Sequence, residues 1–168
     1  MQRNYGRLGA LWIAAGCALV LALPAAAQNR GDRDTREING YRLTDVALGK
    51  YTQAQARVVK LAKQSPGNCD DGDDHSAKSI DQLVAKLDAT AGVRAAIQSA
   101  GMTTREYVVF SLAVFQAGMA DWALSQPGAK LPAGVAMENV TFYRQHQAAM
   151  KKMGETAKAS ECEDSDAD

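Results

Sequence analysis

Apolar residues recur every three or four positions along most of this chain, which is the spacing of one face of an α-helix. The pattern predicts a first helix over residues 44–64, with Leu48, Tyr51 and Val58 on one stripe. Ser65, Pro66 and Gly67 follow this stretch and are expected to end the helix. A second helix is expected to begin near Ser79, whose side chain can cap it, with these apolar residues on one face: Ile80, Leu83, Val84 and Leu87.

The next helix-start signals lie at Thr90 and Thr103. We expect Thr90 to cap a short helix that Gly101 stops. Thr103 stands three residues before Glu106 and directly before a long apolar run, which is the spacing of a capping box. The sequence from residue 107 to 124 is apolar on nearly all sides, so we expect this helix at the centre of a bundle.

A stretch rich in proline and glycine around residues 127–134 predicts an irregular connection. The last helix is expected over about 137–154. No segment alternates apolar and polar residues as a strand would, and no repeat is present. The sequence therefore predicts an all-α domain over residues 41–154, a small bundle of four main helices plus one short helix and no sheet.

The first 27 residues differ in kind from the rest of the chain. Arg3 and Arg7 precede an apolar run over 8–23, and small residues follow at 25–27. This order is typical of a secretory signal peptide cleaved after Ala27. The apolar run is shorter than a bilayer span requires. We therefore expect a periplasmic or secreted protein with no membrane span after cleavage.

Two polar segments flank the predicted domain. Residues 28–40 show no apolar periodicity and are predicted to form a flexible polar leader. Residues 155–168 are predicted to form an acidic, solvated tail.

The formal charge of the whole chain is zero, from 19 basic and 19 acidic residues. Loss of Arg3 and Arg7 with the signal peptide would leave 17 basic against 19 acidic residues, a net charge of −2. A nucleic-acid-binding protein would show a basic excess, so this class is not expected. Asp70, Asp71, Asp73 and Asp74 form an acidic stretch that fits a calcium loop poorly and fits a solvated turn before a helix better.

Cys17 lies in the signal peptide, which leaves Cys69 and Cys162 in the mature chain. Two cysteines in an oxidising compartment predict one disulfide between them. Such a bond would close a long loop and stabilise the fold by about 4 to 5 kcal/mol at most. Free surface thiols are the alternative.

One helical face offers a candidate metal site. His146, Met150 and Met153 are spaced for one face of the last predicted helix. Imidazole and thioether groups together suit Cu(I). Copper is handled in the compartment to which this protein is expected to be exported. The same positions also continue the core stripe of that helix, where methionine often fills gaps. The sequence favours the core interpretation.

Motifs of catalysis and of cofactor binding are missing from the sequence. It contains no nucleophile elbow, zinc-protease, phosphate-loop, dinucleotide or haem-attachment motif. We therefore expect neither an enzyme nor a cofactor.

Three short motifs lie in the second half of the predicted mature chain: Met-Thr-x-Arg-Glu-Tyr at 102–107, Leu-Pro-x-Gly at 131–134 and Phe-x-Arg-x-His at 142–146. In their order and spacing this part of the chain resembles a group of small exported proteobacterial helical proteins without an assigned activity. The resemblance implies export and an all-helical fold. Polar residues of this pattern could form one network between the two longest helices: Arg105, Glu106, Asn139, Arg144 and His146. Their alternative role is in caps and ion pairs at helix ends.

Export, a helical fold and the lack of catalytic motifs together favour a protein that acts by binding. The expected partner is an envelope protein or a small apolar ligand. The alternative is metal handling through His146, Met150 and Met153.

Overall fold

The structure is a computed structural model, and it describes residues 25–64 and 79–158. These residues form seven α-helices and no strand, which confirms the all-α class. The helices are α1 (Ala25–Gly40), α2 (Asp45–Gln64), α3 (Ile80–Ala89), α4 (Val93–Gln98), α5 (Thr104–Leu124), α6 (Met137–Gln145) and α7 (Gln147–Lys158). Residues 1–24 of the predicted signal peptide, the acidic stretch at 70–74, both Cys69 and Cys162, and the end of the predicted acidic tail lie outside the described residues.

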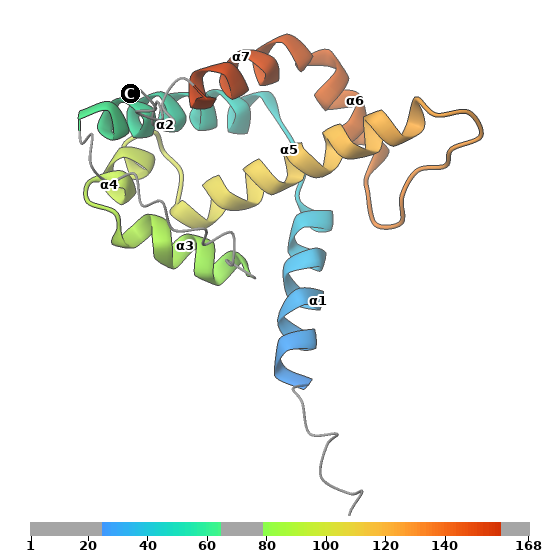
Figure 1. Ribbon diagram of the computed structural model, residues 1–168, viewed down its shortest axis with the longest axis horizontal. Coiled ribbons are helices and arrows are strands. Elements are labelled where there is room, and N and C mark those ends of the chain that lie inside the picture. The colour runs from blue at the N-terminus through green and yellow to red at the C-terminus, as the bar shows by residue number, and fades with distance from the viewer. Residues whose placement is uncertain (1–24, 65–78, 159–168) are drawn as a thin grey trace, which may run out of the picture.

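Helix α5 lies at the centre of the molecule, as its apolar sequence predicts (Figure 1). It contacts α1, α2, α3, α4 and α6. Phe110 on α5 is completely buried, and its ring stacks on Tyr51 of α2 at a centroid distance of 4.6 Å. Tyr51 also stacks on Tyr107, one turn before Phe110, at 4.7 Å. These stacked rings join α2 to the first half of α5.

Helices α2 and α7 run side by side in the same direction (Figure 1). At the start of α2, Asp45 Oδ1 lies 2.8 Å from Nε2 of His146. Two turns further on, the Thr52 hydroxyl, which donates to the carbonyl of Leu48 at 2.8 Å, lies 3.6 Å from the sulfur of Met153. Both helices therefore lead toward the same end of the molecule.

Two of the three predicted helix caps are confirmed. The Ser79 hydroxyl accepts from the backbone N–H of Gln82 at 3.2 Å, and the Thr103 hydroxyl accepts from that of Glu106 at 3.0 Å. The prediction for Thr90 is wrong, because Thr90 ends α3 and Gly92 precedes α4. Gly92 has a φ of +78°, a conformation that glycine adopts with little strain, which allows the sharp turn between these helices.

The predicted last helix is divided into α6 and α7 at His146. This residue leaves helical geometry with φ −109° and ψ 15°. Its backbone N–H still donates to Phe142 and Tyr143, which closes α6 before α7 begins. The division separates one predicted helix into two, and α1 adds another, so the expected count of four main helices and one short helix is not what the described residues show.

The segment predicted as a flexible polar leader is instead helix α1. It extends away from the rest of the molecule in Figure 1, and its C-terminal half contacts α5. Ile38 and Tyr41 pack against both apolar clusters of the core. Charged side chains on other helices also bind it, and these contacts between distant segments are the reason that local periodicity did not reveal the helix.

Candidate binding surface

The second half of α5 carries three large apolar side chains that face solvent. Phe115 is 67% exposed, Met119 50% and Trp122 63%. Their spacing of four and then three residues places them on one face of the helix. We call Phe115, Met119 and Trp122 the exposed stripe. Contiguous apolar surface of this kind is a common sign of a binding site.

The exposed stripe continues a face that is covered further toward the start of α5. Val108 and Leu112 precede Phe115 at the same alternation of four and three residues. Val108 belongs to a buried apolar cluster with Ile80 of α3, and Leu112 packs against that cluster, as do Ile38 and Tyr41. Helix α3 and the end of α1 therefore meet this face up to Leu112, and Phe115, Met119 and Trp122 beyond it are exposed.

The opposite side of this half of α5 is lined by small residues. Ala113, Ala117 and Ala120 are buried. A Cβ atom placed on Gly118 would lie 3.0 Å from the ring of Tyr143, so glycine allows α6 to approach α5 closely. Arg144 of α6 donates to Asp121 of α5 at 2.5 Å. Small residues thus face the core, while the large residues of the same half face outward.

An ionic cluster fixes the position of α5 relative to α1 and α3. Arg105 of α5 donates through Nε to Glu37 of α1 at 2.8 Å and through Nη1 to Asp81 of α3 at 2.6 Å. Arg33 of α1 donates to the other oxygen of Asp81 at 2.5 Å. The hydrogen bonds from Arg105 lower the pKa of Glu37 and of Asp81, and those to the two carboxylates raise the pKa of Arg105.

A buried carboxylate completes the contact between α1 and α3. Asp34 is 7% exposed, and its Oδ2 accepts from the backbone N–H of Ile80 at 2.8 Å. Negative charge is favoured at this end of a helix. The second oxygen, Oδ1, is buried without a hydrogen-bond partner and lies 3.8 Å from Nε of Arg33. Asp34 therefore caps α3 from a segment more than 40 residues away in sequence.

The polar residues singled out by the family-like pattern do not form one network. Arg105 binds Glu37 and Asp81, whereas Arg144 binds Asp121. The backbone N–H of Glu106 takes part in the Thr103 cap.

Asn139 is almost fully buried and bonds elsewhere. It accepts from the backbone N–H of Leu43 at 3.0 Å and donates to the carbonyl of Tyr41 at 2.9 Å. It therefore fixes the connection between α1 and α2. The contacts of these polar residues are therefore separate from one another. They match the alternative that the sequence offered, in which Arg105, Glu106 and Arg144 take part in caps and ion pairs at helix ends.

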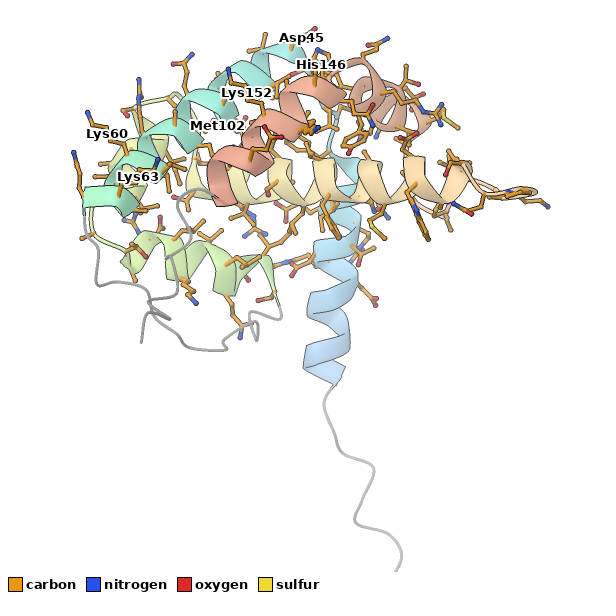
Figure 2. The ribbon with its side chains drawn as sticks, turned by 45° about the horizontal axis from the view of Figure 1, so that its top comes forward. Asp45, Lys60, Lys63, Met102, His146 and Lys152 are labelled. Atoms are coloured by element: carbon orange, nitrogen blue, oxygen red, sulfur yellow. The ribbon has the colours of Figure 1, made fainter. Side chains whose placement is uncertain are left out.

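The residues of the candidate copper site make separate contacts. Figure 2 shows His146 beside Asp45, and Nδ1 of His146 lies 2.9 Å from the carbonyl oxygen of Phe142. Both ring nitrogens are therefore within hydrogen-bonding distance of protein oxygens. Met150 is buried in the core, and the sulfur of Met153 lies 3.6 Å from the hydroxyl of Thr52. Within the described ranges, no group of three or more histidine, cysteine or acidic residues is placed to hold a metal.

By length and composition, α5 is the one described helix long and apolar enough to cross a membrane. One third of its most apolar stretch is buried within the molecule. The central helix of a soluble bundle can have the same length and composition.

Comparison with protein-family models, with curated proteins and with solved structures finds no match to this chain.

Sequence reasoning missed Asp34 and Glu37, which attach α1 to α3 and α5. Their signal in the sequence is weak. Asp34, Ile38 and Tyr41 have helical spacing, but only two of them are apolar. The exposed stripe was also missed as a surface, because its residues belong to a helix predicted to be apolar on nearly all sides.

Proposed function

We propose that this chain is an exported helical protein that binds an envelope protein through the exposed stripe and does not act by catalysis. The observation that carries this proposal is the outward position of Phe115, Met119 and Trp122 on a helix whose opposite face is buried in the core. Aromatic side chains and methionine are enriched at protein interfaces. A rigid, centrally held helix also presents them without a large loss of conformational entropy on binding.

Two surface hollows among the described residues give less support to a small apolar ligand. One lies on α3 and includes Asp81, Asp88 and Arg94 in its wall. The other lies beside α6 and includes Glu138 and Gln145. Both are open to solvent and partly charged, whereas sites for apolar ligands are enclosed and mainly apolar. We therefore favour a protein partner.

The proposal of export rests on the sequence pattern of residues 1–27. Mass spectrometry of protein purified from the envelope fraction tests it, since cleavage after Ala27 would leave a chain beginning at Gln28.

The same mass measurement, made before and after reduction, tests the proposed disulfide between Cys69 and Cys162. A gain of two mass units on reduction is expected if they pair within one chain.

Copper handling by His146, Met150 and Met153 remains a separate hypothesis. Metal analysis of the purified wild type tests it. A stoichiometric copper signal that is lost in His146→Ala would support the hypothesis, and a wild type without bound copper after exposure to Cu(I) would reject it.

Site-specific photo-crosslinking in cells tests the proposed function. A photoreactive amino acid at Met119 would lie on the exposed stripe, and one at Val46 would provide a control on α2 that is 71% exposed. We expect one discrete cross-linked protein from position 119 and none of that mass from position 46. The product should disappear when Phe115 and Trp122 are both replaced by serine. Equal cross-linking from both positions, or none from position 119, would overturn the proposal.

A further inference from the structure

Helices α2 and α7 carry most of the excess positive charge of the described residues. They contain seven basic and two acidic residues, whereas the rest of the described chain contains nine basic and eight acidic residues. The two helices lie side by side, so their charges add on one side of the molecule (Figure 1). The seven basic residues are Lys50, Arg57, Lys60 and Lys63 on α2 and Lys151, Lys152 and Lys158 on α7.

Part of this charge is presented to solvent. Lys60, Lys63 and Lys152 are exposed, and Figure 2 shows the first two toward the end of α2 and the third on the neighbouring α7. We call these three lysines the basic face. Lys60 and Lys63 lie eight and eleven residues after Thr52, which contacts Met153, the residue next to Lys152. At about 1.5 Å per residue, the basic face extends over roughly 16 Å.

Lys60 and Lys63 differ from the arginines of the fold in their partners. Arg33, Arg105 and Arg144 each lie within ion-pair distance of a carboxylate. Lys60 and Lys63 have no such carboxylate among the residues that the structure describes. The described part of the fold therefore leaves the charge of these two lysines available to an anionic partner.

The exposed side of α2 around the basic face has no large apolar anchor. From Gly49 to Lys63, every exposed position of α2 carries a small or polar residue. Protein interfaces are centred on large aromatic anchors and are depleted in lysine. Lysine is a compact, strongly hydrated point charge, and lysines on a protein surface are attracted to anionic lipid. The basic face therefore suits a lipid surface better than a protein partner.

We propose that the basic face binds the phosphate groups of an anionic lipid bilayer and holds the exported protein at the bilayer surface without insertion. This inference goes beyond the proposed function, because it concerns a different side of the molecule. The lipid would lie against α2 and α7, while the protein partner would bind α5.

The exposed stripe lies on the side of α5 opposite to α2. The ring of Tyr51 on α2 stacks on Phe110 of α5. Successive residues of a helix are turned by about 100°, so the residues of the exposed stripe lie about 120° to 180° around α5 from Phe110. A protein bound to lipid through α2 and α7 would therefore direct the exposed stripe away from the bilayer and leave it open to a partner.

The chain's own acidic segments are the alternative occupants of the basic face. Residues 65–78 follow α2 and include four aspartates, and residues 159–168 follow α7 and include five acidic residues. A second copy of the basic face is disfavoured, since like charges repel each other. The experiment below separates the acidic segments from lipid.

Co-sedimentation with lipid vesicles tests the inference. The protein is the exported form purified from the envelope fraction, with Trp12→Phe so that Trp122 is its only tryptophan. The vesicles consist of phosphatidylcholine alone or with about one third phosphatidylglycerol, which supplies the negative charge. We expect the anionic vesicles to bind the protein at least tenfold more tightly than the neutral ones. Salt at about 1 M, where the screening length falls to about 3 Å, should abolish this difference.

Two double variants remove the same charge on and off the basic face. Each lysine near an anionic lipid surface contributes about fivefold to affinity, so Lys60→Gln with Lys63→Gln should weaken binding to anionic vesicles about twentyfold. Lys86→Gln with Lys130→Gln removes two exposed lysines outside α2 and α7. This control should weaken binding less than about threefold, because screening limits the reach of distant charges.

The fluorescence of Trp122 reports the orientation of the bound protein. We expect its emission, and its quenching by acrylamide, to be the same with and without anionic vesicles. A shift of the emission to shorter wavelengths on binding would show that the exposed stripe enters the lipid, and would overturn the inference.

Three binding results would also overturn the inference. These are no binding by the wild type, equal binding to the two kinds of vesicle, and equal weakening by the two double variants. In the first case, the acidic segments are removed in turn, by ending the chain at Lys158 or by replacing the four aspartates of residues 65–78 with asparagine. Binding gained in either variant would show that an acidic segment of the chain occupies the basic face.

Cross-linking from Met119 in cells separates this inference from the proposed function. A cross-linked partner together with failure to bind anionic vesicles would reject only the lipid site. Binding to anionic vesicles without a cross-linked partner would reject only the proposed function.

Discussion

The two halves of α5 use similar residues in opposite ways. In the first half, Val108, Val109 and Phe110 are buried beneath α2 and α3. In the second half, alanines are buried and the large side chains of Phe115, Met119 and Trp122 face solvent. The apolar composition of a helix therefore indicates how much of its surface favours burial. It does not indicate which side of the helix the rest of the chain covers. The uncovered side is the part available to a partner.

The largest loss of stability is expected on replacing Phe110, the buried counterpart of Phe115 in the exposed half of α5. Phe110→Ala removes a fully buried ring and leaves a cavity among Tyr51 and its neighbours. We expect a loss of about 3 to 5 kcal/mol in the free energy of unfolding. Urea denaturation followed by circular dichroism measures it. A loss below about 1 kcal/mol would mean that the first half of α5 is not the core.

A smaller loss is expected where α1 caps α3. Asp34→Ala leaves the buried N–H of Ile80 without its acceptor. We expect a cost of about 1 to 3 kcal/mol. Asp32→Ala, an exposed change on the same helix, should cost less than about 0.5 kcal/mol. Equal effects in the two variants would show that α1 is not held against α3.

The ionic cluster predicts a dependence of stability on pH. The hydrogen bonds from Arg105 lower the pKa of Glu37 below its ordinary value of 4.5. A carboxyl group with a lowered pKa in the folded state adds stability above the unfolded pKa and loses it as pH falls through the folded pKa. The free energy of unfolding should therefore decrease on acidification below about pH 5.

Glu37→Gln should make this decrease shallower, and Glu138→Gln, an exposed change on α6, should leave it as in the wild type. Urea titrations at a series of pH values measure both. An unchanged slope in Glu37→Gln would mean that Glu37 is not paired with Arg105 in solution.

The smallest effect on folding is expected in the exposed stripe. Phe115→Ala removes the same atoms as Phe110→Ala, but from a ring that is mostly in water. We expect a change of less than about 0.5 kcal/mol in the free energy of unfolding. The cross-linking from Met119 should nevertheless weaken. A large loss of stability would place this ring inside the fold.

The sequence predicted the helices whose stability comes from local signals. The apolar stripes of α2 and α3 and the caps at Ser79 and Thr103 are properties of neighbouring residues. Helix α1 was not predicted, because its contacts with Asp81 and Arg105 join segments far apart in sequence. The break at His146 was also not predicted, since no proline or glycine marks it.

The candidate surface was predictable only in part. The sequence places Phe115, Met119 and Trp122 in one apolar helix, and their spacing puts them on one face. Which face remains open depends on where α3 begins and on how closely α6 approaches at Gly118. Both are properties of tertiary packing, and a single helix does not encode them.

Quenching of Trp122 fluorescence by acrylamide tests the central claim most directly. The measurement uses the dilute full chain with Trp12→Phe and compares it with a free indole and with the unfolded protein in urea. We predict that the folded chain is quenched nearly as efficiently as the unfolded one, because Trp122 is 63% exposed. Strong protection in the folded chain alone would show that the exposed stripe is already covered, and would contradict the account.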